Sequence, residues 1–538
     1  MALMGVSVAY TSWFFDDTNK ITVYFNTSTS NLEQMVQMRE GDVVPVIGLE
    51  VHIQLETDTK IFCGCSTKMT IEPNANVCPI CLGLPGALPT LNEAAVRAAV
   101  KIGKAIGADI SRETSFHRKN YFYPDLPKGF QITQYDEPIC TNGEMEINVE
   151  GNRRKIRIER AHLEEDPGSL QHISERKRGD EYVLVDYNRA GVPLVEIVTE
   201  PDLRAPKEVR LFLAKLEEDL EYLGVFDSTR DGSLRADANV SLIRKSDVNE
   251  DGTIDREILR AAERIEIKNI SSYKGAEKAL VYEISRQKNT IMHGGEIKQE
   301  TRHWDENRGI TTSMRAKETE GDYRYFTEFD LPSLTGEWWE EYVRDIEIPE
   351  LPEAKRKRFY EEYRLTEEVA SKLTSTRDVA EFYEAIVEEF DPDLAARWVA
   401  DIILGELNYR NMNIEDAIDR LDEFRRLIEL VSKEKITEKN ARSVVLRRML
   451  DENISPEEVI NQEKLEISSE KEVKKFILEV IEENKSAVED YDRGESNAIN
   501  YLVGKVMAKT QGNADPTVIN QILKTILDDG EMERKDLQ

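Results

Sequence analysis

Several features of common protein classes are missing from this sequence of 538 residues. It has five cysteines, too few for a disulfide-dense secreted scaffold. No apolar stretch reaches the roughly 18 to 20 residues that span a bilayer, so we expect no membrane association. Glycine and proline number 28 and 18, which excludes a collagen-like chain. With 40% hydrophobic residues, the composition predicts a soluble globular protein of several domains.

Motifs that bind nucleotides or activate nucleophiles at a familiar spacing are also absent. There is no GxxxxGK[ST] loop and no GxGxxG between a strand and a helix. Neither a GxSxG elbow nor an HExxH helix is found. A nucleotide, if one binds, would therefore be held without a Walker loop.

Basic side chains are fewer than acidic ones, 72 against 104, which gives a formal net charge of −32. This balance argues against binding of nucleic acid through a broad basic surface. It does not exclude local basic and aromatic patches, because net charge describes the long-range field. The acidity fits either a salty cytoplasm, where acidic surfaces aid solubility, or a mild compositional bias.

The first 43 residues have no Lys or Arg before their apolar stretch and no clear small-residue cleavage site. A secretory signal is therefore not expected, and we interpret residues 1–43 as an extension of unassigned role. Four of the five cysteines lie in one cluster, which favours a metal site in a cytoplasmic protein over secreted disulfides.

The distribution of predicted strands and helices along the sequence indicates an α+β fold with three parts after the extension. Residues 44–338 alternate strands and short helices, with VIGLEVHIQL and LVEIVTEPDL as strands, and we expect a mixed-sheet catalytic domain. Residues 339–465 have the Glu, Lys and Arg content and spacing of a helical domain. Residues 466–538 predict a small helical tail domain.

The sequence predicts where two helices of the C-terminal part begin. Ser455, Pro456 and Glu458 form an N-cap, first-turn proline and capping-box pattern. Asp515 and Pro516 give a second start. The apolar face that follows the second start consists of Ile519, Ile522, Leu523 and Ile526.

The cysteine cluster has a C-x-C…C-x-x-C spacing, formed by Cys63, Cys65, Cys78 and Cys81. Two short-spaced pairs can close a tetrahedral thiolate site, which predicts a structural zinc ion. The alternatives are reduced thiols that only pack together, or a disulfide, which is rare in a cytosolic chain. Cys140 stands apart and is interpreted as a buried thiol.

Acidic residues and histidines interrupt the predicted strands. Glu50 and His52 are two apart and share one face of a strand. Further candidates are His162, Glu164, Glu165, Asp166, Glu196 and Glu200. Because burying an unpaired charge is costly, such carboxylates need a cation. Spacing alone fits salt bridges with arginines better than Mg²⁺, although a hard cation with oxygen ligands would also suit them.

Other polar motifs combine basic, amide and aromatic side chains between apolar strands. Their members include Lys119, Asn120, Lys128, Arg235, Asp237, Asn239, Ser313, Arg315, Lys317 and Arg324. Each motif alone could be a turn or a solvated face, but together they predict a polar binding site.

The motifs, taken in order, resemble the GatB family, the B subunits of tRNA-dependent amidotransferases. The resemblance rests on VIGLEVHIQL, KIFCGC, NVCPICLGLPGALP, RKNYFYPDLPKGFQITQYDEPI, HLEEDPG, LVDYNRAGVPLVEIVTEPD, GSLRADANVS, ETRHWDE and DYRYF. The tail segment INYLVGKVMAKTQGNADPTVINQIL resembles the family's YqeY-like tail. The related archaeal GatE subunits carry a large inserted domain, for which this chain has no room.

The resemblance implies a heterotrimer with an amidase subunit, GatA, and a small subunit, GatC. It implies that the chain binds misacylated Asp-tRNA(Asn) or Glu-tRNA(Gln) and phosphorylates the side-chain carboxylate with ATP and Mg²⁺. Ammonia from glutamine, released by GatA and delivered through a channel, would then form the amide. The alternative is a non-catalytic tRNA-binding adaptor of the same complex. The sequence does not indicate which tRNA is preferred.

The resemblance also implies residue roles. The Mg²⁺ ligands and catalytic residues would be Glu50, His52, Glu165 and Glu196, and zinc would bind the four clustered cysteines. We expect phosphate contacts from Lys119, Lys128, Arg235, Lys268, Arg315 and Arg324. The tail would contact tRNA near Lys505, Lys509 and Lys524, whose alternative is a solvated helical face.

Overall fold

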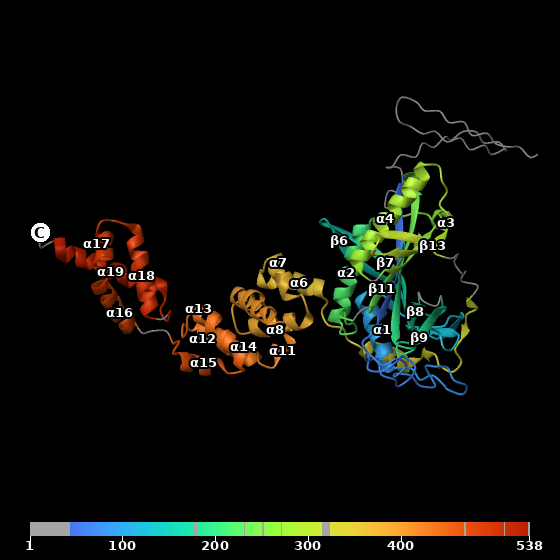
Figure 1. Cartoon of the computed structure of the whole chain (residues 1–538), viewed down its shortest axis with the longest axis horizontal. Coiled ribbons are helices and arrows are strands. Elements are labelled where there is room, and N and C mark those ends of the chain that lie inside the picture. Colours follow the sequence, from blue (N-terminus) through green and yellow to red (C-terminus); the bar gives the residue numbers. More distant parts are fainter. Residues whose placement is uncertain are drawn as a thin grey trace, which may run out of the picture. The chain divides into compact units, whose positions relative to one another are not determined.

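The computed structural model describes residues 43–535 apart from 176–179, 231, 250–251, 271, 315–322, 467–469 and 511. Arg315, Lys317 and residues 1–42 of the predicted extension therefore lie outside the described residues. The chain divides into two compact units, Met1–Leu351 and Pro352–Gln538 (Figure 1). Among the described residues, no helix has the length and apolarity needed to cross a membrane.

The first unit contains most of the strands. They are β1 (Val43–Gln54), β2 (Asp109–Ile110), β3 (Glu113–Thr114), β4 (His117–Asn120), β5 (Phe130–Thr133), β6 (Cys140–Val149), β7 (Asn152–Glu165), β8 (Ser169–Glu175), β9 (Asp180–Asp186), β10 (Pro193–Thr199), β11 (Leu234–Arg244), β12 (Ile265–Ile270), β13 (Glu300–Asp305), β14 (Ile310–Ser313), β15 (Phe326–Thr327) and β16 (Leu334–Thr335). Its helices are α1 (Glu93–Ala105), α2 (Pro206–Tyr222), α3 (Arg256–Ala261), α4 (Tyr273–Met292) and α5 (Glu337–Asp345), with a 3₁₀ turn η2 (Lys245–Asp247).

One large mixed sheet organises this unit. Its strand order is β14-β13-β12-β11-β1-β10-β7-β5-β4-β15, and β6 and β2 branch from β7. Only the β12–β13 pair is parallel among the pairs of this sheet in the described residues. The predicted α+β class with a mixed sheet is confirmed.

The two faces of the sheet differ in chemistry because side chains alternate along each strand. In β1, Leu49, Val51 and Ile53 are buried in the apolar core. Helices α2 and α4 contact each other and contribute to this core, and α4 also contacts β11 (Figure 1). Glu50 and His52 belong to the opposite face, as predicted, and this face carries the polar side chains of β10, β11 and β12.

Helix α5 belongs to the first unit, although we predicted that the helical domain begins at residue 339. Trp339 is buried, and its indole Nε1 donates to the Ser111 carbonyl at 2.8 Å. Lys104 Nζ donates to the Val343 carbonyl at 2.6 Å. The division between the units consequently follows Leu351.

The second unit is helical in its described residues. Its helices are α6 (Pro352–Tyr363), α7 (Glu367–Leu373), α8 (Arg377–Val387), α9 (Pro392–Ala396), α10 (Leu404–Tyr409), α11 (Glu415–Ile418), α12 (Leu421–Ser432), α13 (Glu438–Asn440), α14 (Leu446–Glu452), α15 (Pro456–Glu463), α16 (Glu470–Glu483), α17 (Lys485–Asp492), α18 (Ser496–Lys509) and α19 (Pro516–Lys535), with π-helical segments η4 (Arg397–Ile403) and η5 (Ala441–Val445).

Residues on both sides of the predicted 465/466 boundary pack together in this unit. Asn440 Nδ2 donates to Asn513 Oδ1 at 2.6 Å, and Asn513 Nδ2 donates to the Lys464 carbonyl at 2.9 Å. Both asparagines are buried. The helical domain and the tail are therefore joined by a buried amide contact within one compact unit.

Candidate functional site

Three central strands bring an imidazole and two carboxylates together on the polar face. The strand register pairs His52 with Glu196 on β10, and Glu196 with His162 on β7. Glu164 follows His162 by two residues and shares its face. His52 Nε2 lies 3.3 Å from Glu196 Oε2 and 3.5 Å from Glu164 Oε1. We call His52, Glu164 and Glu196 the histidine cluster.

The side chains of His52 and Glu164 in the histidine cluster hold their protons more tightly than free side chains do, because the carboxylates of the cluster are buried together. Burial lowers the pKa of His52, but its hydrogen bond with Glu196 and the nearby carboxylates outweigh this and raise the pKa to about 9. Burial, followed by the charge of Glu196, raises the pKa of Glu164 to about 7. The cluster therefore has a strong need for positive charge.

A second acidic group lies on the neighbouring strands of the same face. Glu50 of β1, Asp237 of β11 and Glu266 of β12 bring their carboxylate oxygens within 4.8 Å of one another. Asn239 Nδ2 donates to Glu50 Oε1 at 3.0 Å. Lys268 Nζ lies 3.3 Å from Asp237 Oδ2. We call Glu50, Asp237 and Glu266 the carboxylate cluster.

The carboxylate cluster has the oxygen donors that a hard divalent cation such as Mg²⁺ uses, and the histidine cluster offers two carboxylates together with an imidazole nitrogen. Asn239 Oδ1 is buried without a hydrogen-bond partner in the described part of the chain, so the carboxylate cluster also has an unused oxygen donor beside it. Among the described residues, no lysine or arginine forms an ion pair with Glu164 or Glu196. The salt-bridge alternative does describe Asp166, which pairs with Arg235 and Arg189.

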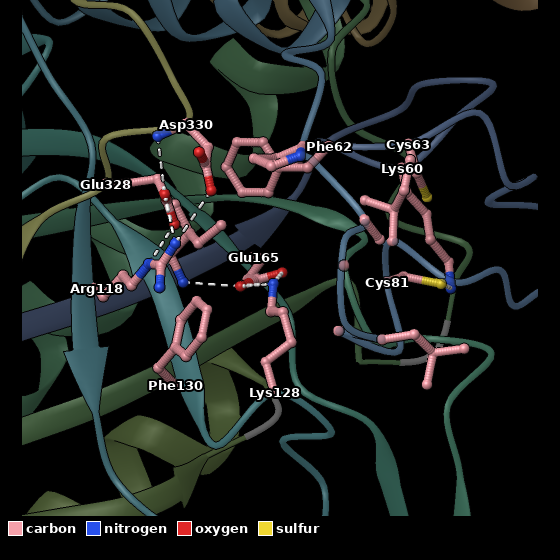
Figure 2. Close-up of a pocket in the computed structure, with 17 residues that line it drawn as sticks. Lys60, Phe62, Cys63, Cys81, Arg118, Lys128, Phe130, Glu165, Glu328 and Asp330 are labelled. Carbon is pink, nitrogen blue, oxygen red and sulfur yellow. Dashed lines mark hydrogen bonds and ion pairs between the residues drawn. The ribbon is translucent and has the colours of Figure 1, made fainter.

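Glu165 is not brought to either cluster. It follows Glu164 on β7, and adjacent strand residues point to opposite faces. Its carboxylate forms an ion pair with Lys128 and accepts a 2.7 Å hydrogen bond from the Ile132 amide (Figure 2). The first glutamate of this motif therefore lies beside His52 and Glu196, whereas the second, to which the resemblance assigned a Mg²⁺-binding role, does not.

Glu165 and Lys128 instead line a cavity of about 180 Å³ on the other side of β7. Lys60, Cys63 and Cys81 lie across it, as Figure 2 shows. A second ion pair on its wall joins Arg118 to Glu328 and Asp330 (Figure 2).

The four clustered cysteines are free thiols whose sulfur atoms lie within 4.8 Å of one another. The Cys78 and Cys81 sulfurs are 3.9 Å apart. Sulfurs bound at 2.3 Å around a tetrahedral zinc ion would be separated by about 3.8 Å, so the residues fit zinc. Lys60 is fully buried, with its Nζ 3.8 Å from Cys81 Sγ, and it adds a positive charge next to the thiols.

The cations predicted to contact phosphate are distributed over several places. Arg235 and Lys268 pair with carboxylates of the polar face. Lys119 of β4 lies over the Tyr323 ring at 4.9 Å, and although burial lowers its pKa, the charges of Glu164, Tyr325 and Glu196 raise it overall. Lys128 faces the cavity of Figure 2, and Arg324 is exposed with a φ of 46°.

Sequence reasoning named Asp237 and Glu164 without choosing them as ligands, and it missed Glu266 and Lys60. Alternation along the motif that contains His162 could have favoured Glu164. Glu266 gives no local signal, because its place beside Glu50 depends on the pairing of β11 with β12.

Two family profiles match the chain. The one described as GatB/GatE catalytic domain matches residues 45–340, and the one described as GatB domain matches residues 381–527. Both matches are consistent with the division into a mixed-sheet unit and a helical unit.

Curated relatives match nearly the whole chain. A protein from Haloquadratum walsbyi, named as the B subunit of aspartyl/glutamyl-tRNA(Asn/Gln) amidotransferase, is 61% identical over 493 residues, which cover 91% of this chain and 99% of the relative. Proteins of the same name from Halobacterium salinarum and Methanospirillum hungatei are 58% identical over 489 residues and 49% identical over 494 residues. These two matches cover 91% and 90% of this chain, and 98% and 99% of the relatives. Together with the catalytic-domain profile, these matches establish that the chain belongs to the GatB family.

Proposed function

We propose that this chain is the B subunit of an aspartyl/glutamyl-tRNA amidotransferase and carries its ATP-dependent amidation site. The observation that supports this most is the pair of metal-fitting clusters side by side on β1, one at His52 and one at Glu50. A purely structural sheet would gain little from the histidine cluster, because it is costly to bury two carboxylates that have no lysine or arginine ion pair among the described residues.

The reaction explains why such a site is needed. A carboxylate resists attack by ammonia because an oxide would have to leave. In the proposed sequence, a side-chain carboxylate oxygen of the misacylated tRNA attacks the γ-phosphorus of ATP, and the bond from that phosphorus to ADP breaks. Ammonia then attacks the acyl phosphate carbon, loses a proton and releases inorganic phosphate, which leaves the amide.

The protein's own part is to gather and orient negatively charged reactants. Mg²⁺ held by the two clusters would neutralise the charge that phosphates and the substrate carboxylate bring together. Lys119, Arg235 and Lys268 border the clusters and can hold phosphate oxygens. Carboxylates position Arg235 and Lys268 through the ion pairs with Asp166 and Asp237, and the Tyr323 ring lies beside the Lys119 ammonium group.

The partners follow from the same proposal. An amidase subunit, GatA, would supply ammonia, GatC would stabilise the complex, and the location would be cytoplasmic. The tail remains our candidate for tRNA contact, although Lys509 is already paired with Glu479 and Glu483. Lys505 lies over the Tyr501 ring at 5.2 Å.

Substitution of the two adjacent glutamates tests the proposal. In the complex reconstituted with its partner subunits, Glu164→Gln should lower ATP-dependent amidation of misacylated tRNA about 100-fold, because it removes a buried charge from the metal-fitting cluster. Glutamine hydrolysis should remain measurable. Glu165→Gln is the matched control, with the same chemical change one residue later, and should leave the Mg²⁺ dependence of ADP formation unchanged.

Two results would contradict this proposal. If the wild-type complex binds misacylated tRNA but forms no ADP, the chain is an adaptor. If Glu164→Gln amidates at the wild-type rate, the histidine cluster is not part of the reaction site.

A further inference from the structure

Lys60 is a fully buried lysine whose positive charge has no carboxylate partner among the described residues. Its Nζ donates to two backbone carbonyls, that of Asn76 at 2.7 Å and that of Tyr187 at 3.2 Å. Carbonyl oxygens carry only partial charge, and an ammonium group buried without a full countercharge is costly. The surroundings of Lys60 therefore require an anion other than Asp or Glu.

The cysteine cluster can supply that anion. Lys60 Nζ lies 3.8 Å from Cys81 Sγ, and Figure 2 shows the ammonium group beside this sulfur. Four thiolates around one divalent zinc ion leave two negative charges in excess, and Cys63 and Cys81 are buried. Such an anion needs a cation for the same reason that Lys60 needs an anion. Each of these buried charges explains the other.

The other donor to the Cys81 sulfur carries no net charge. It is the Cys78 amide, which donates to Cys81 Sγ at 3.2 Å. Within the described ranges, no arginine or second lysine donates a hydrogen bond to one of the four clustered sulfurs. Lys68 lies in the same segment, but its side chain is exposed. Lys60 is therefore the cation that the structure places next to the thiols.

The backbone holds Lys60 at this position from two sides. The Lys60 amide donates to the Cys65 carbonyl at 2.9 Å, and the Ile61 amide donates to the Gly191 carbonyl at 2.9 Å. A Cβ atom placed on Gly191 would lie 3.5 Å from Lys60 Cδ and 3.7 Å from Cys81 Cβ. The stem of the lysine is thus enclosed between the cysteine segment and the loop of Gly191, so its ammonium group remains beside Cys81.

We propose that Lys60 is the buried counterion of the four-cysteine zinc site, and that its charge strengthens zinc binding and protects the thiolates from electrophiles. A thiolate that accepts a hydrogen bond from an ammonium group is stabilised and becomes a weaker nucleophile. Zinc binding displaces protons from thiols, so the cluster is most negative, and Lys60 contributes most, when the ion is bound. The inference does not depend on the proposed function, because it concerns the cysteine segment and not the polar face of the sheet.

Substitution by methionine tests the charge, because Lys60→Met keeps an unbranched side chain and removes the ammonium group. Zinc affinity of the full chain is measured by competition with a fluorescent chelator. Lys60→Met should weaken zinc binding at least about tenfold, as expected for loss of a hydrogen bond from a charged group. The matched control is Lys68→Met, the same change at an exposed position of the same segment, and it should bind zinc as the wild type does.

Cobalt(II) gives a spectroscopic test that does not depend on affinity. When it replaces zinc at a thiolate site, charge transfer from sulfur to the metal produces an absorption band. Lys60→Met should move this band to longer wavelength, because the sulfur electrons lose a neighbouring positive charge. The thiolates of the zinc-loaded variant should also react several-fold faster with an alkylating reagent than those of the wild type.

Thermal unfolding distinguishes a counterion from a residue that only packs. Lys60→Met should lower the unfolding temperature more in the zinc-loaded chain than in the zinc-free chain, because the charge and the ion stabilise each other. Lys60→Gln retains an N–H donor for the carbonyls without the charge, and it should weaken zinc binding in the same way.

Unchanged zinc affinity in Lys60→Met and Lys60→Gln would overturn the inference, and so would a cobalt band that does not move. An equal loss of unfolding temperature with and without zinc would also overturn it, since Lys60 would then act only through packing and the two carbonyls. None of these measurements involves ATP or tRNA, so each result leaves the proposed function standing.

Discussion

At the scale of single residues, the protonation of the histidine cluster would couple cation binding to proton release. His52 and Glu164 have pKa values of about 9 and about 7, above the ordinary values of 6.5 and 4.5. Near neutral pH both groups therefore hold protons that free side chains would largely have lost. A metal ion bound by these atoms must displace those protons.

We predict that Mg²⁺ affinity of the full chain rises between pH 6 and pH 9, with proton release on binding. Calorimetry in two buffers with different ionisation enthalpies measures the released protons. In the metal-free protein, the stability contributed by Glu164 should be lost as pH rises from 4.5 through about 7, and that of His52 as pH rises from 6.5 through about 9. Affinity that does not change with pH would contradict a role of these groups as ligands.

The sequence did not determine which of the two adjacent glutamates, Glu164 or Glu165, faces the site. Alternation fixes only that Glu164 and Glu165 point to opposite faces. The choice between the faces depends on the pairing of His162 on β7 with Glu196 on β10, which are separate strands. A salt-bridge interpretation suited Glu165 and Asp166, and a metal interpretation suits Glu164.

At the scale of elements, the cysteine segment is attached to the sheet by a few polar contacts. Lys60 Nζ donates to the Asn76 carbonyl at 2.7 Å and to the Tyr187 carbonyl at 3.2 Å. The Asn76 amide donates to Asn188 Oδ1 at 2.8 Å. Between Cys63 and Cys81 the structure has turns and one isolated bridge but no helix or strand, so four ligand bonds would supply much of its order.

We predict that the purified chain holds about one zinc ion and that Cys78→Ser loses it. Metal content is measured after extensive dialysis, and the unfolding temperature is followed by calorimetry. Zinc loss should lower the unfolding temperature of the first unit by several degrees. Cys140→Ala is the control, because Cys140 is buried away from the cluster and its loss should destabilise without changing zinc content. Absence of zinc from the wild-type chain would contradict the prediction.

Local sequence patterns predicted individual helices and strands well, but they did not predict which elements pair or pack with one another. The strand around Glu50 and the capping box of α15 are confirmed, and in the latter Ser455 accepts from the Glu458 amide at 3.3 Å. Alternation and capping are properties of neighbouring residues. The pairing of Glu50 with Asp237 joins residues far apart in the sequence, and the burial of Trp339 depends on a surface formed by other segments.

At the scale of the whole molecule, the net charge of −32 sets a repulsion that the fold must withstand. Some of this charge is concentrated in the two clusters, and much of the rest lies on exposed helices with many ion pairs. The charge constrains how a polyanionic partner could be held, through local arginine, lysine and tyrosine side chains, but it does not exclude one.

We predict that KCl stabilises the chain, with an unfolding temperature several degrees higher at 1 M than at 0.1 M, because salt screens repulsion between acidic groups. Calorimetry at pH 7.5 measures this effect. The same comparison at pH 5, close to the sequence pI of about 4.8, is the control, and the effect should shrink there. An unfolding temperature that falls with salt at pH 7.5 would show that attractive ion pairs dominate instead.

The placement of Gly48, Glu50 and His52 at alternate positions of β1 has a consequence for how the molecule can change. Side chains could be replaced one at a time, but an insertion or deletion of one residue between them would turn part of the series into the apolar core. Nearby loops can vary in length and leave the two clusters in place. In β1 the number of residues is itself a requirement, so we expect length variants of this strand to be the least tolerated changes in the first unit.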